Sequence, residues 1–359
     1  MQLRKILYKI LLSVNILFAL TLVISYLSVS INPKYFALPS LFGLAYPYLL
    51  LINIILVLIW AMMLKYEALI SVVIIAAGFT HFSNYIKLSR PKGDKTNTFK
   101  VLSYNVRMFN YLETTNRNSK DKILEFIKTQ KPDIICLQEY YEPSGYVEKI
   151  DAFKSDLPGK YYSQTKKVGK GGKNFYGIVT FSKFPIIRQG EIEHHGSTSL
   201  SIFTDVLIGK DTFRIYNNHL QSFRLKRMQH SFLEEITQSD DTETLDEVKN
   251  ITLSLRKAFA RRALQAETVK NHISKSPYPV IVAGDFNDTP VSYSYRKIRK
   301  GLNDAFVNSG YGAGFTYKGN YPANRIDYIL YSKSLISSYF EIIKIKYSDH
   351  YPIIAYFRR

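Results

Sequence analysis

The residues best suited to chemistry follow an apolar run late in the chain. Residues 280–283 are fully apolar, which is typical of a buried strand, and Gly284-Asp285-Phe286-Asn287 follows directly. Asp285 and Asn287 are two residues apart, so extended backbone would point both side chains to the same side. A carboxylate and an amide at the end of a buried strand suit the binding of a metal-bound phosphate. The alternative is an ordinary turn, because Gly, Asp and Asn are common in turns.

Other short apolar runs end in, or lie beside, polar residues of the same kind. These residues are Asn105, Glu139, His219, Asp327, Asp349 and His350. An unpaired carboxylate is costly to bury, so such residues need a polar partner, a metal or water. Glu139 and Asp349 offer the oxygen ligands that Mg²⁺ prefers, and a histidine can activate water or protonate a leaving oxygen. If these ends converge, they form a cup suited to metal-assisted phosphoester chemistry.

The sequence excludes several other kinds of site. It has no Cys/His cluster for structural zinc and no G-x-x-x-x-G-K-[ST] loop for nucleotides. Cys136 is the single cysteine and lies in an apolar run, which favours a buried core residue and excludes a disulfide within the chain. The formal net charge of +19 would attract polyanions or anionic lipid headgroups.

Short strands alternating with helices must position these polar residues. Strands are predicted at residues 99–106, 134–137, 177–181, 199–207, 213–218, 280–283, 325–330 and 352–357. Helices are predicted at 120–129, before Pro132, and at 256–273, with Arg261 and Arg262 on a solvated face. This alternation predicts a layered α/β or α+β fold rather than a helical bundle.

Residues 1–96 are predicted to form a membrane region and a linker. The candidate transmembrane helices are 6–29, 41–64 and 68–86, since about 20 residues cross a bilayer as a helix. Polar residues weaken the third segment, which leaves two spans as the alternative. A signal peptide is disfavoured because a second long apolar segment follows the first.

The basic residues near the first span give a prediction of sidedness. Arg4, Lys5 and Lys9 favour a cytoplasmic N-terminus, so three crossings would place the rest of the chain outside. The basic cluster within residues 87–95 argues against this placement. We expect a multi-pass protein of a bacterial inner membrane with its catalytic domain in the periplasm.

A series of short motifs occurs in order between residues 103 and 350. The motifs are Ser103-Tyr104-Asn105-Val106, Leu137-Gln138-Glu139, Tyr176-Gly177-Ile178, Phe181-Ser182-Lys183, Asn218-His219-Leu220, Gly284-Asp285-Phe286-Asn287, Arg325-Ile326-Asp327-Tyr328 and Ser348-Asp349-His350. The series resembles the endonuclease/exonuclease/phosphatase superfamily, whose members include pancreatic deoxyribonuclease, apurinic endonucleases, inositol phosphatases and bacterial sphingomyelinases. The resemblance covers residues 97–359. It implies a four-layer α/β sandwich, with two packed β-sheets between helices, and metal-dependent phosphoester hydrolysis.

The resemblance also implies which residues hold the metal and the substrate. Glu139 would be the principal Mg²⁺ ligand, with Mn²⁺ able to replace the ion, and Asn105 and Asp349 would lie near it. Arg107 stands where apurinic endonucleases carry an acidic residue, so it would clamp a phosphate oxygen or pair with a carboxylate. This departure argues against a second metal. Tyr176 is expected to contact the substrate.

The remaining motif residues would carry the catalytic steps. His350 would pair with Asp327 and handle the attacking water or the scissile phosphate. Asp285 and Asn287 would hold and polarise the phosphate and the nucleophile, and either Asp285 or His350 would activate the water. His219 matches the deoxyribonuclease and sphingomyelinase branches and disfavours the apurinic endonucleases, which usually have no histidine there.

These expectations lead to a membrane-tethered, Mg²⁺-dependent phosphodiesterase. The substrate would be a nucleic acid or a phospholipid or glycolipid headgroup, and the tether favours the lipid. The bilayer is the expected partner, with no obligate protein partner evident. The alternative is an inactive, membrane-anchored binding module for anionic ligands, against which the complete set of motif residues argues.

Overall fold

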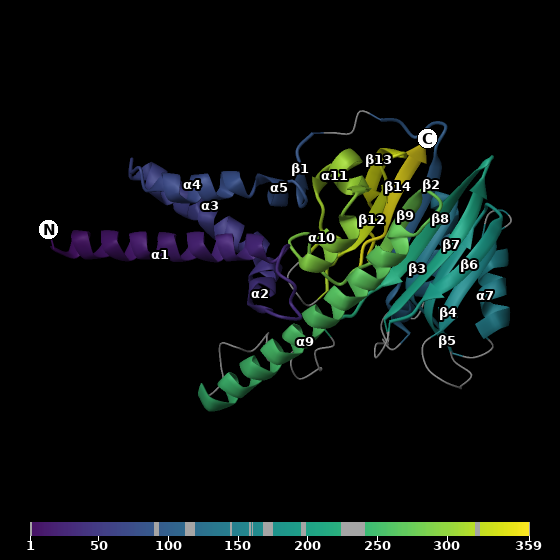
Figure 1. The fold of residues 1–359 in the computed structure, drawn as a ribbon, viewed down its shortest axis with the longest axis horizontal. Helices are drawn as coiled ribbons and strands as arrows, with labels where there is room; N and C mark the ends of the chain where they lie inside the picture. Colours follow the sequence, from purple (N-terminus) through teal and green to yellow (C-terminus); the bar gives the residue numbers. More distant parts are fainter. Residues whose placement is uncertain are drawn as a thin grey trace. The chain divides into compact units, whose positions relative to one another are not determined.

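The computed structural model describes most of the chain as two compact units. The residues outside the description are 1, 90–92, 112–118, 144–145, 158, 160, 168–174, 195–198, 224–240, 320–323 and 359, together with the side chains of 146–149 and 241–247. Unit 1 comprises Met1–Asn84, Phe223–Leu264 and Asp288–Arg296, and unit 2 comprises Tyr85–Ser222, Gln265–Asn287 and Lys297–Arg359. Figure 1 shows the elements of both units.

Unit 2 is built on two six-stranded sheets. The first has the order β13 (Ile336–Ile342), β14 (Ile353–Arg358), β2 (Phe99–Asn105), β3 (Ile134–Glu142), β5 (Phe175–Ser182) and β4 (Tyr162–Lys167). The second has the order β10 (Leu302–Asp304), β12 (Asp327–Ser332), β9 (Val280–Asp285), β8 (Asp211–His219), β7 (Leu200–Ile208) and β6 (Ile186–Ile192). A short pair joins β1 (Ile86–Lys87) to β11 (Gly312–Ala313).

The two sheets pack face to face because the residues on their facing sides are apolar. In β2, Val101 points into the core between the sheets, which Ile215 of β8 and Ile281 of β9 also enter. The next residue, Leu102, points the other way and packs with Ile123 of α6 (Ser119–Gln130).

Helices cover the outer faces of both sheets. On the first sheet, α7 (Tyr146–Ser155) joins α6 in the outer core. On the second sheet, His272 at the end of α9 (Asp241–Ser274) bonds the Tyr216 hydroxyl at 2.9 Å and packs against Phe203. Two shorter helices, α10 (Tyr293–Arg299) and α11 (Ala305–Ser309), follow β9 and β10. The predicted four-layer α/β sandwich is therefore confirmed.

Parallel strand pairs at the centre of each sheet bring the polar strand ends to one edge. β2 runs parallel to β3, so Asn105 pairs with Gln138 in register, and Glu139 follows directly. β8 runs parallel to β9, which places His219 opposite Asp285. The antiparallel neighbour β12 begins at the same edge, with Asp327 opposite Asp285.

The structure corrects one expectation about the second predicted helix. That helix begins at Asp241, well before residue 256, and Arg262 is fully buried rather than solvated. Its guanidinium pairs with Asp288, where Arg262 Nε lies 3.1 Å from a carboxylate oxygen. A buried charge needs such a partner, which the sequence spacing did not reveal.

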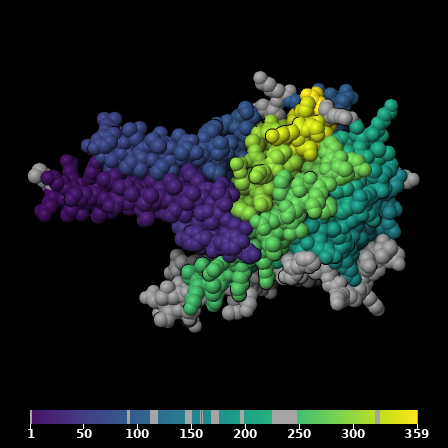
Figure 2. Space-filling model, in the orientation of Figure 1, coloured from purple at the N-terminus to yellow at the C-terminus, as the bar shows by residue number. Residues whose placement is uncertain are grey.

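Unit 1 contains the apolar N-terminal helices. They are α1 (Gln2–Leu27), α2 (Leu38–Leu44), α3 (Tyr46–Met62), α4 (Ala68–Ala77) and α5 (Phe79–Phe82). By length and composition α1 can cross a membrane, and α2 with α3 would form a second span if the pair, bent by 68°, is one span. Within the described residues α4 is a shorter apolar helix. Figure 2 shows these helices packed together, in purple and blue.

The interior of this helical bundle contains polar residues beside apolar ones, and much of its surface is apolar. Asn15 of α1, Asn53 of α3 and Ser71 of α4 are fully buried. The Ser71 hydroxyl lies 2.7 Å from Asn15 Oδ1 and 2.9 Å from Asn53 Oδ1, so one hydroxyl links three helices. Leu22 and Trp60 are buried as well, whereas many other large apolar side chains face outward, for example Leu7 and Leu58, which are 56% and 57% exposed.

Candidate active site

Two backbone irregularities aim side chains at the shared edge of the sheets. The pairing of β3 with β5 shifts in register between Leu137 and Tyr140, and Glu139 within this bulge has a φ of +51°. Bulges often redirect a side chain beside a functional site. Gly284 has a φ of +136°, and a Cβ there would lie 2.0 Å from the carbonyl oxygen of Asn218. Glycine therefore allows β9 to approach β8 closely just before Asp285.

The Asn105 side chain connects carboxylates that come from the two sheets. Its amide donates to Glu139 Oε1 at 3.1 Å and to Asp285 Oδ2 at 3.0 Å. Its oxygen accepts the backbone N–H of Arg107 at 3.0 Å. Asn287, with a φ of +53°, donates its side-chain amide to the same Asp285 oxygen at 3.2 Å. The carboxylate of Asp285 is thus held from several directions.

Both candidate catalytic histidines reach this cluster. His219 Nε2 lies 3.4 Å from Glu139 Oε1 and 3.9 Å from Asp285 Oδ2. His350 Nε2 lies 3.8 Å from that same Asp285 oxygen, and His350 Nδ1 lies 2.9 Å from Asp327 Oδ2. The Asp327 contact fixes which imidazole nitrogen faces the cluster. The Nε2 atoms of both rings are therefore directed at Asp285.

Burial and neighbouring charge shift the pKa values of this cluster. Burial raises the pKa of Asp285 to about 6, although His350 and His219 oppose that rise. Burial alone would lower the pKa of His350, but the carboxylates of Asp327 and Asp285 outweigh it and raise the pKa to about 10. His350 is therefore a cation at neutral pH, which suits contact with a phosphate oxygen.

The donor set fits a divalent cation. Ligand atoms of Asp285, Asp327 and His350 all lie within 4.8 Å of one another. Glu139 adds a half-buried carboxylate, and His219 Nε2 is a buried atom with no hydrogen-bond partner among the described residues. Carboxylate and amide oxygens are suitable ligands for Mg²⁺, so the carboxylates and Asn105 are the candidate ligands, whereas protonated His350, held by Asp327, has no free lone pair for a metal.

Arg107 and Asp349 lie at the rim of the cluster. Arg107 Nε is 3.3 Å from Asp349 Oδ2, so the cation pairs with a carboxylate, one of the two roles expected for it. Ser348 beside it donates to the carbonyl oxygen of Asn105 at 2.8 Å. Tyr176 lies on β5, in register with Tyr141 of β3. Its role as a substrate contact stays a prediction.

Sequence reasoning missed a residue that supports Asp327. The Thr316 hydroxyl oxygen accepts the backbone N–H groups of Ile326 and Asp327, each at 3.1 Å. Thr316 is fully buried and lies outside the motifs. It lies just after β11, and nothing in its local sequence marks it for this role.

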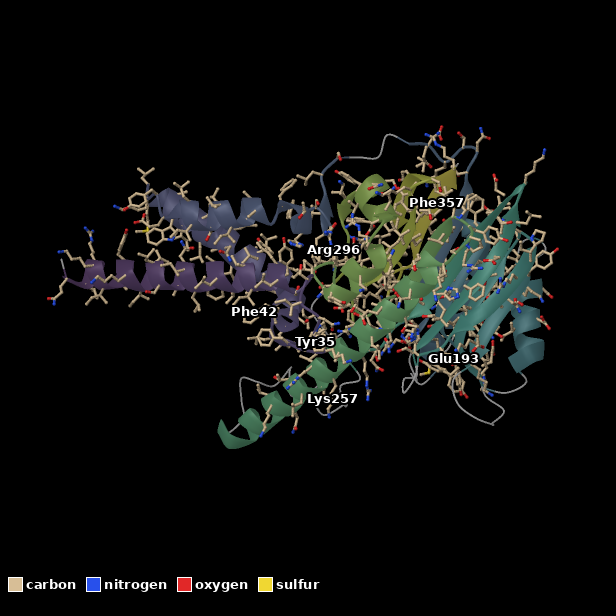
Figure 3. The ribbon with its side chains drawn as sticks, viewed as in Figure 1. Tyr35, Phe42, Glu193, Lys257, Arg296 and Phe357 are labelled. Carbon is tan, nitrogen blue, oxygen red and sulfur yellow. The ribbon has the colours of Figure 1, made fainter. Side chains whose placement is uncertain are left out.

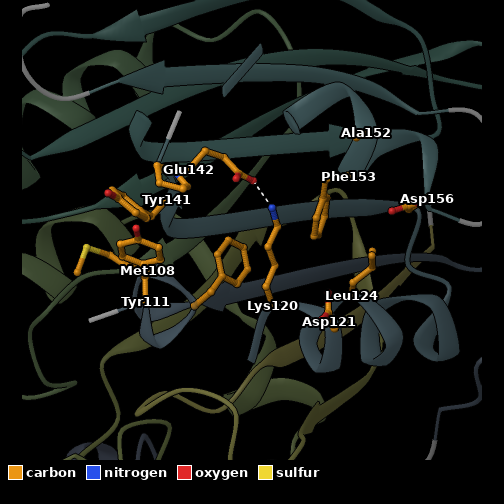
Figure 4. A pocket seen from close by; sticks show the side chains of 12 residues that line it. Met108, Tyr111, Lys120, Asp121, Leu124, Tyr141, Glu142, Ala152, Phe153 and Asp156 are labelled. Carbon is orange, nitrogen blue, oxygen red and sulfur yellow. Dashed lines mark hydrogen bonds and ion pairs between the residues drawn. The ribbon is translucent and has the colours of Figure 1, made fainter. Parts of the chain in front are cut away.

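A pocket of about 430 Å³ next to these motif residues was also missed. It is lined by Met108, Phe109, Tyr111, Lys120, Asp121, Leu124, Tyr141, Glu142, Pro143, Ala152, Phe153 and Asp156. Figure 4 shows Lys120 reaching Glu142 between the tyrosines on one side and Phe153 on the other. Glu142 also accepts the Tyr140 hydroxyl at 2.8 Å. A buried carboxylate with these partners was not foreseeable, because Lys120 is distant in sequence.

Comparison with known proteins agrees with this geometry. The model of the endonuclease/exonuclease/phosphatase family matches residues 102–350. The chain belongs to this family. It is thus a phosphoric ester hydrolase, because endonucleases, exonucleases and phosphatases all hydrolyse phosphoester bonds. A second family model, described as a domain of unknown function, matches residues 8–85. No curated protein matches the chain.

Solved structures of family members share the fold of the catalytic domain. A family protein from Bacteroides vulgatus is 17% identical with a TM-score of 0.54, covering 73% of this chain and 99% of its own. The human Nocturnin catalytic domain with bound sulfate is 18% identical with a TM-score of 0.52, covering 75% and 99%. Humanized D. rerio TDP2 is 17% identical with a TM-score of 0.51, covering 73% and 99%. At these identities the likeness establishes the fold alone.

Proposed function

We propose that the chain is a membrane-tethered, Mg²⁺-dependent phosphodiesterase. The observation that carries the proposal is the position of Asp285, whose Oδ2 lies 3.9 Å and 3.8 Å from the Nε2 atoms of His219 and His350. Hydrolysis of a phosphodiester needs an activated water, a neutralised phosphate and a stabilised leaving oxygen. The cluster offers a group for each need.

Glu139 would hold the Mg²⁺ ion, with Asn105 and Asp349 near it. When bound, Mg²⁺ neutralises charge on the phosphate. The bulge that carries Glu139 fixes the direction of its carboxylate, and the Asn105 amide holds that carboxylate 3.1 Å away. The pairing of Arg107 with Asp349 supports a site for one ion, because the cation disfavours a second positive charge beside it.

Of the two candidates for activating water, Asp285 suits the role better. The pKa of His350 is raised to about 10 by its carboxylate neighbours, so its imidazole has no free lone pair at neutral pH. Asp285 is buried and has a raised pKa of about 6, which makes its carboxylate a stronger base than an exposed one. Asp285 would take a proton from water as the new P–O bond forms, while cationic His350 holds a phosphate oxygen.

His219 would complete the reaction from the other side of Asp285. Its Nε2 atom is directed at the cluster from the end of β8, separate from the strand that carries Asp327. The bond from phosphorus to the leaving oxygen breaks as that oxygen takes a proton from His219. The alternative role of His219 is to bind a phosphate oxygen. In that case, removing the His219 side chain would weaken binding of the transition state.

The apolar surface and the buried polar contacts of the N-terminal bundle support the membrane tether. Exposed leucines around buried Asn15, Asn53 and Ser71 are unlike the polar surface of a water-soluble bundle, and polar groups linking helices are common inside membranes. Tyr8, near the start of α1, bonds Glu67, whereas Tyr26, near its end, donates to the Ile74 carbonyl oxygen of α4 at 3.0 Å. α1 and α4 therefore run in the same direction, as they would with an odd number of crossings. Together with the basic residues Arg4, Lys5 and Lys9, which favour a cytoplasmic N-terminus, this supports a periplasmic catalytic domain.

The tether favours a phosphodiester at the bilayer surface, such as a phospholipid or glycolipid headgroup. The test is hydrolysis by the purified full-length protein of DNA, RNA, sphingomyelin, phosphoinositides and sugar phosphates, with and without Mg²⁺. Metal-dependent turnover of a lipid diester, absent in Glu139→Gln, supports the proposal. Preference for DNA or RNA would replace the lipid with nucleic acid. Failure on the whole panel would favour the inactive binding module, against which the assembled cluster argues.

A further inference from the structure

The first half of α9 has an unusual exposed face. Between residues 248 and 264 the sequence has five basic residues and no acidic residue. Four of the basic side chains are exposed, namely Lys249, Arg256, Lys257 and Arg261. Positions 249, 253, 256, 260 and 264 follow helical spacing, so they form one stripe along the helix.

Large apolar side chains share this stripe or lie beside it. Leu253 and Leu264 are 42% and 52% exposed, and Val248 at the start of the segment is 46% exposed. The opposite side of the helix is buried through Ile251 and Phe259. A helix face that is only solvated carries polar residues, whereas leucines between lysines and arginines are typical of a helix that lies on a membrane surface.

A second segment of the same unit has the composition of a membrane interface. The segment after α1 exposes Tyr35 by 79% and Phe36 by 53%, and Leu38 at the start of α2 is 48% exposed. The Lys34 ammonium lies 5.7 Å from the ring centre of Tyr35. Tyrosine and basic residues favour the headgroup level at the end of a membrane helix, and α1 ends nearby at Leu27. Tyr35 and Lys257 are labelled in Figure 3.

We propose that residues 248–264 of α9 form an interfacial helix that docks on the anionic headgroups of the bilayer that holds the chain. The proposal rests on the membrane tether proposed above. An anionic bilayer is the inferred partner of this helix, because the exposed side chains are basic and because apolar side chains lie on the same stripe. Each basic residue near an anionic bilayer strengthens attachment by roughly fivefold, and salt screens this attraction. Leu253 and Leu264 would enter the boundary between headgroups and acyl chains.

The test uses a fluorophore on the stripe. Leu253→Cys can be labelled selectively, because the native Cys136 is fully buried. The full-length protein, carrying an environment-sensitive probe, is reconstituted in vesicles of phosphatidylcholine with or without phosphatidylglycerol. We expect a blue-shifted emission and quenching by headgroup-level nitroxide lipids in the anionic vesicles, and reversal in high salt. Ile187→Cys on β6, 52% exposed, is the matched control and should report water in both vesicles.

A charge variant separates docking from the tether. Lys249→Gln, Arg256→Gln, Lys257→Gln and Arg261→Gln together should abolish the spectral shift while the protein stays in the carbonate-resistant membrane fraction. Release of the unaltered protein by carbonate would overturn the tether. The protein could instead stay in that fraction while the probe at position 253 remains exposed to water in anionic vesicles. That result would overturn the docking of α9 but leave the tether standing. A spectral shift produced by DNA but not by anionic lipid would also overturn the docking, in favour of a nucleic-acid surface.

Discussion

Replacing Asp327 by Asn tests whether His350 acts as a cation. The Asp327 carboxylate is buried and lies 2.9 Å from His350 Nδ1. Two opposite charges about 4 Å apart interact by about 4 kcal/mol at an effective dielectric of about 20, which is about three pK units. Asp327→Asn removes that interaction but keeps the side-chain shape. The pKa of His350 should then fall from about 10 by about three units, to about 7, because only Asp285 and Asp349 remain to offset its burial.

The expected result is a changed pH profile as well as a slower enzyme. In the unaltered protein the raised pKa keeps His350 protonated throughout the neutral range. In Asp327→Asn the protonated form is lost as the pH rises through the lowered pKa. We expect kcat/KM at pH 8 to fall by about tenfold or more, because a pKa near 7 leaves roughly a tenth of His350 protonated there, with recovery of most of this loss at pH 6. The assay measures kcat/KM against pH, with the substrate identified from the panel.

A buried aspartate outside the cluster provides the control. Asp205 accepts two hydrogen bonds from Arg214, at 2.6 Å and 2.8 Å, and is fully buried. Asp205→Asn should destabilise the fold by about 3–5 kcal/mol, yet leave the pH profile of kcat/KM unchanged. If Asp327→Asn had the same profile as the unaltered protein, cationic His350 would be refuted.

Four further outcomes are expected. Glu139→Gln keeps the shape but removes the ligand charge, so isothermal titration should show weakened Mg²⁺ binding and assays no metal-dependent turnover. An unchanged melting temperature would separate this from unfolding. His219→Ala should lower kcat by at least about 10²-fold, since an acid–base group is lost; near-normal kcat on the true substrate would exclude its proposed role. Gly284→Ala should lower the melting temperature measured by calorimetry, because its Cβ would lie 2.0 Å from the Asn218 carbonyl oxygen, and an unchanged temperature would contradict the close approach. A C-terminal alkaline phosphatase fusion should be active and a fluorescent-protein fusion dark, whereas the opposite pair of results would reverse the proposed sidedness.

The strands that the sequence predicted and those that it missed differ in their place in the sheets. All eight predicted strands occur, and they fill the inner positions of both six-stranded sheets. The missed strands of these sheets are their edges, namely β4, β6, β10 and β13. An inner strand between two packed layers is apolar over its length, which a short run reveals. An edge strand such as Tyr162–Lys167 is partly exposed and carries polar residues, so its pattern resembles that of a loop.

The site was predictable to the extent that it lies at strand ends. His219 and Asp285 end neighbouring parallel strands, so strand pairing alone brings them to one edge, whereas Asn105 ends a strand of the other sheet and reaches them through the packing of the two sheets. The direction of Glu139 was not predictable, because it depends on a bulge against β5. The Lys120–Glu142 pair depends on how α6 packs against β3, and packing of helices on sheets leaves no local signal in the sequence.

The cluster depends on the registry of the two sheets, and buried amides between them hold that registry. Gln138 on β3 donates to Asn217 Oδ1 on β8 at 2.7 Å. The Asn217 amide in turn donates to the Val179 carbonyl oxygen of β5 at 3.0 Å. Each amide is fully buried, and each lies next to, or two residues from, a site residue: Gln138 precedes Glu139, and Asn217 precedes His219 by two. Directional hydrogen bonds between buried amides favour one alignment where an apolar core would tolerate several, so these bonds help to align β3 with β8, whose Glu139 and His219 lie 3.4 Å apart.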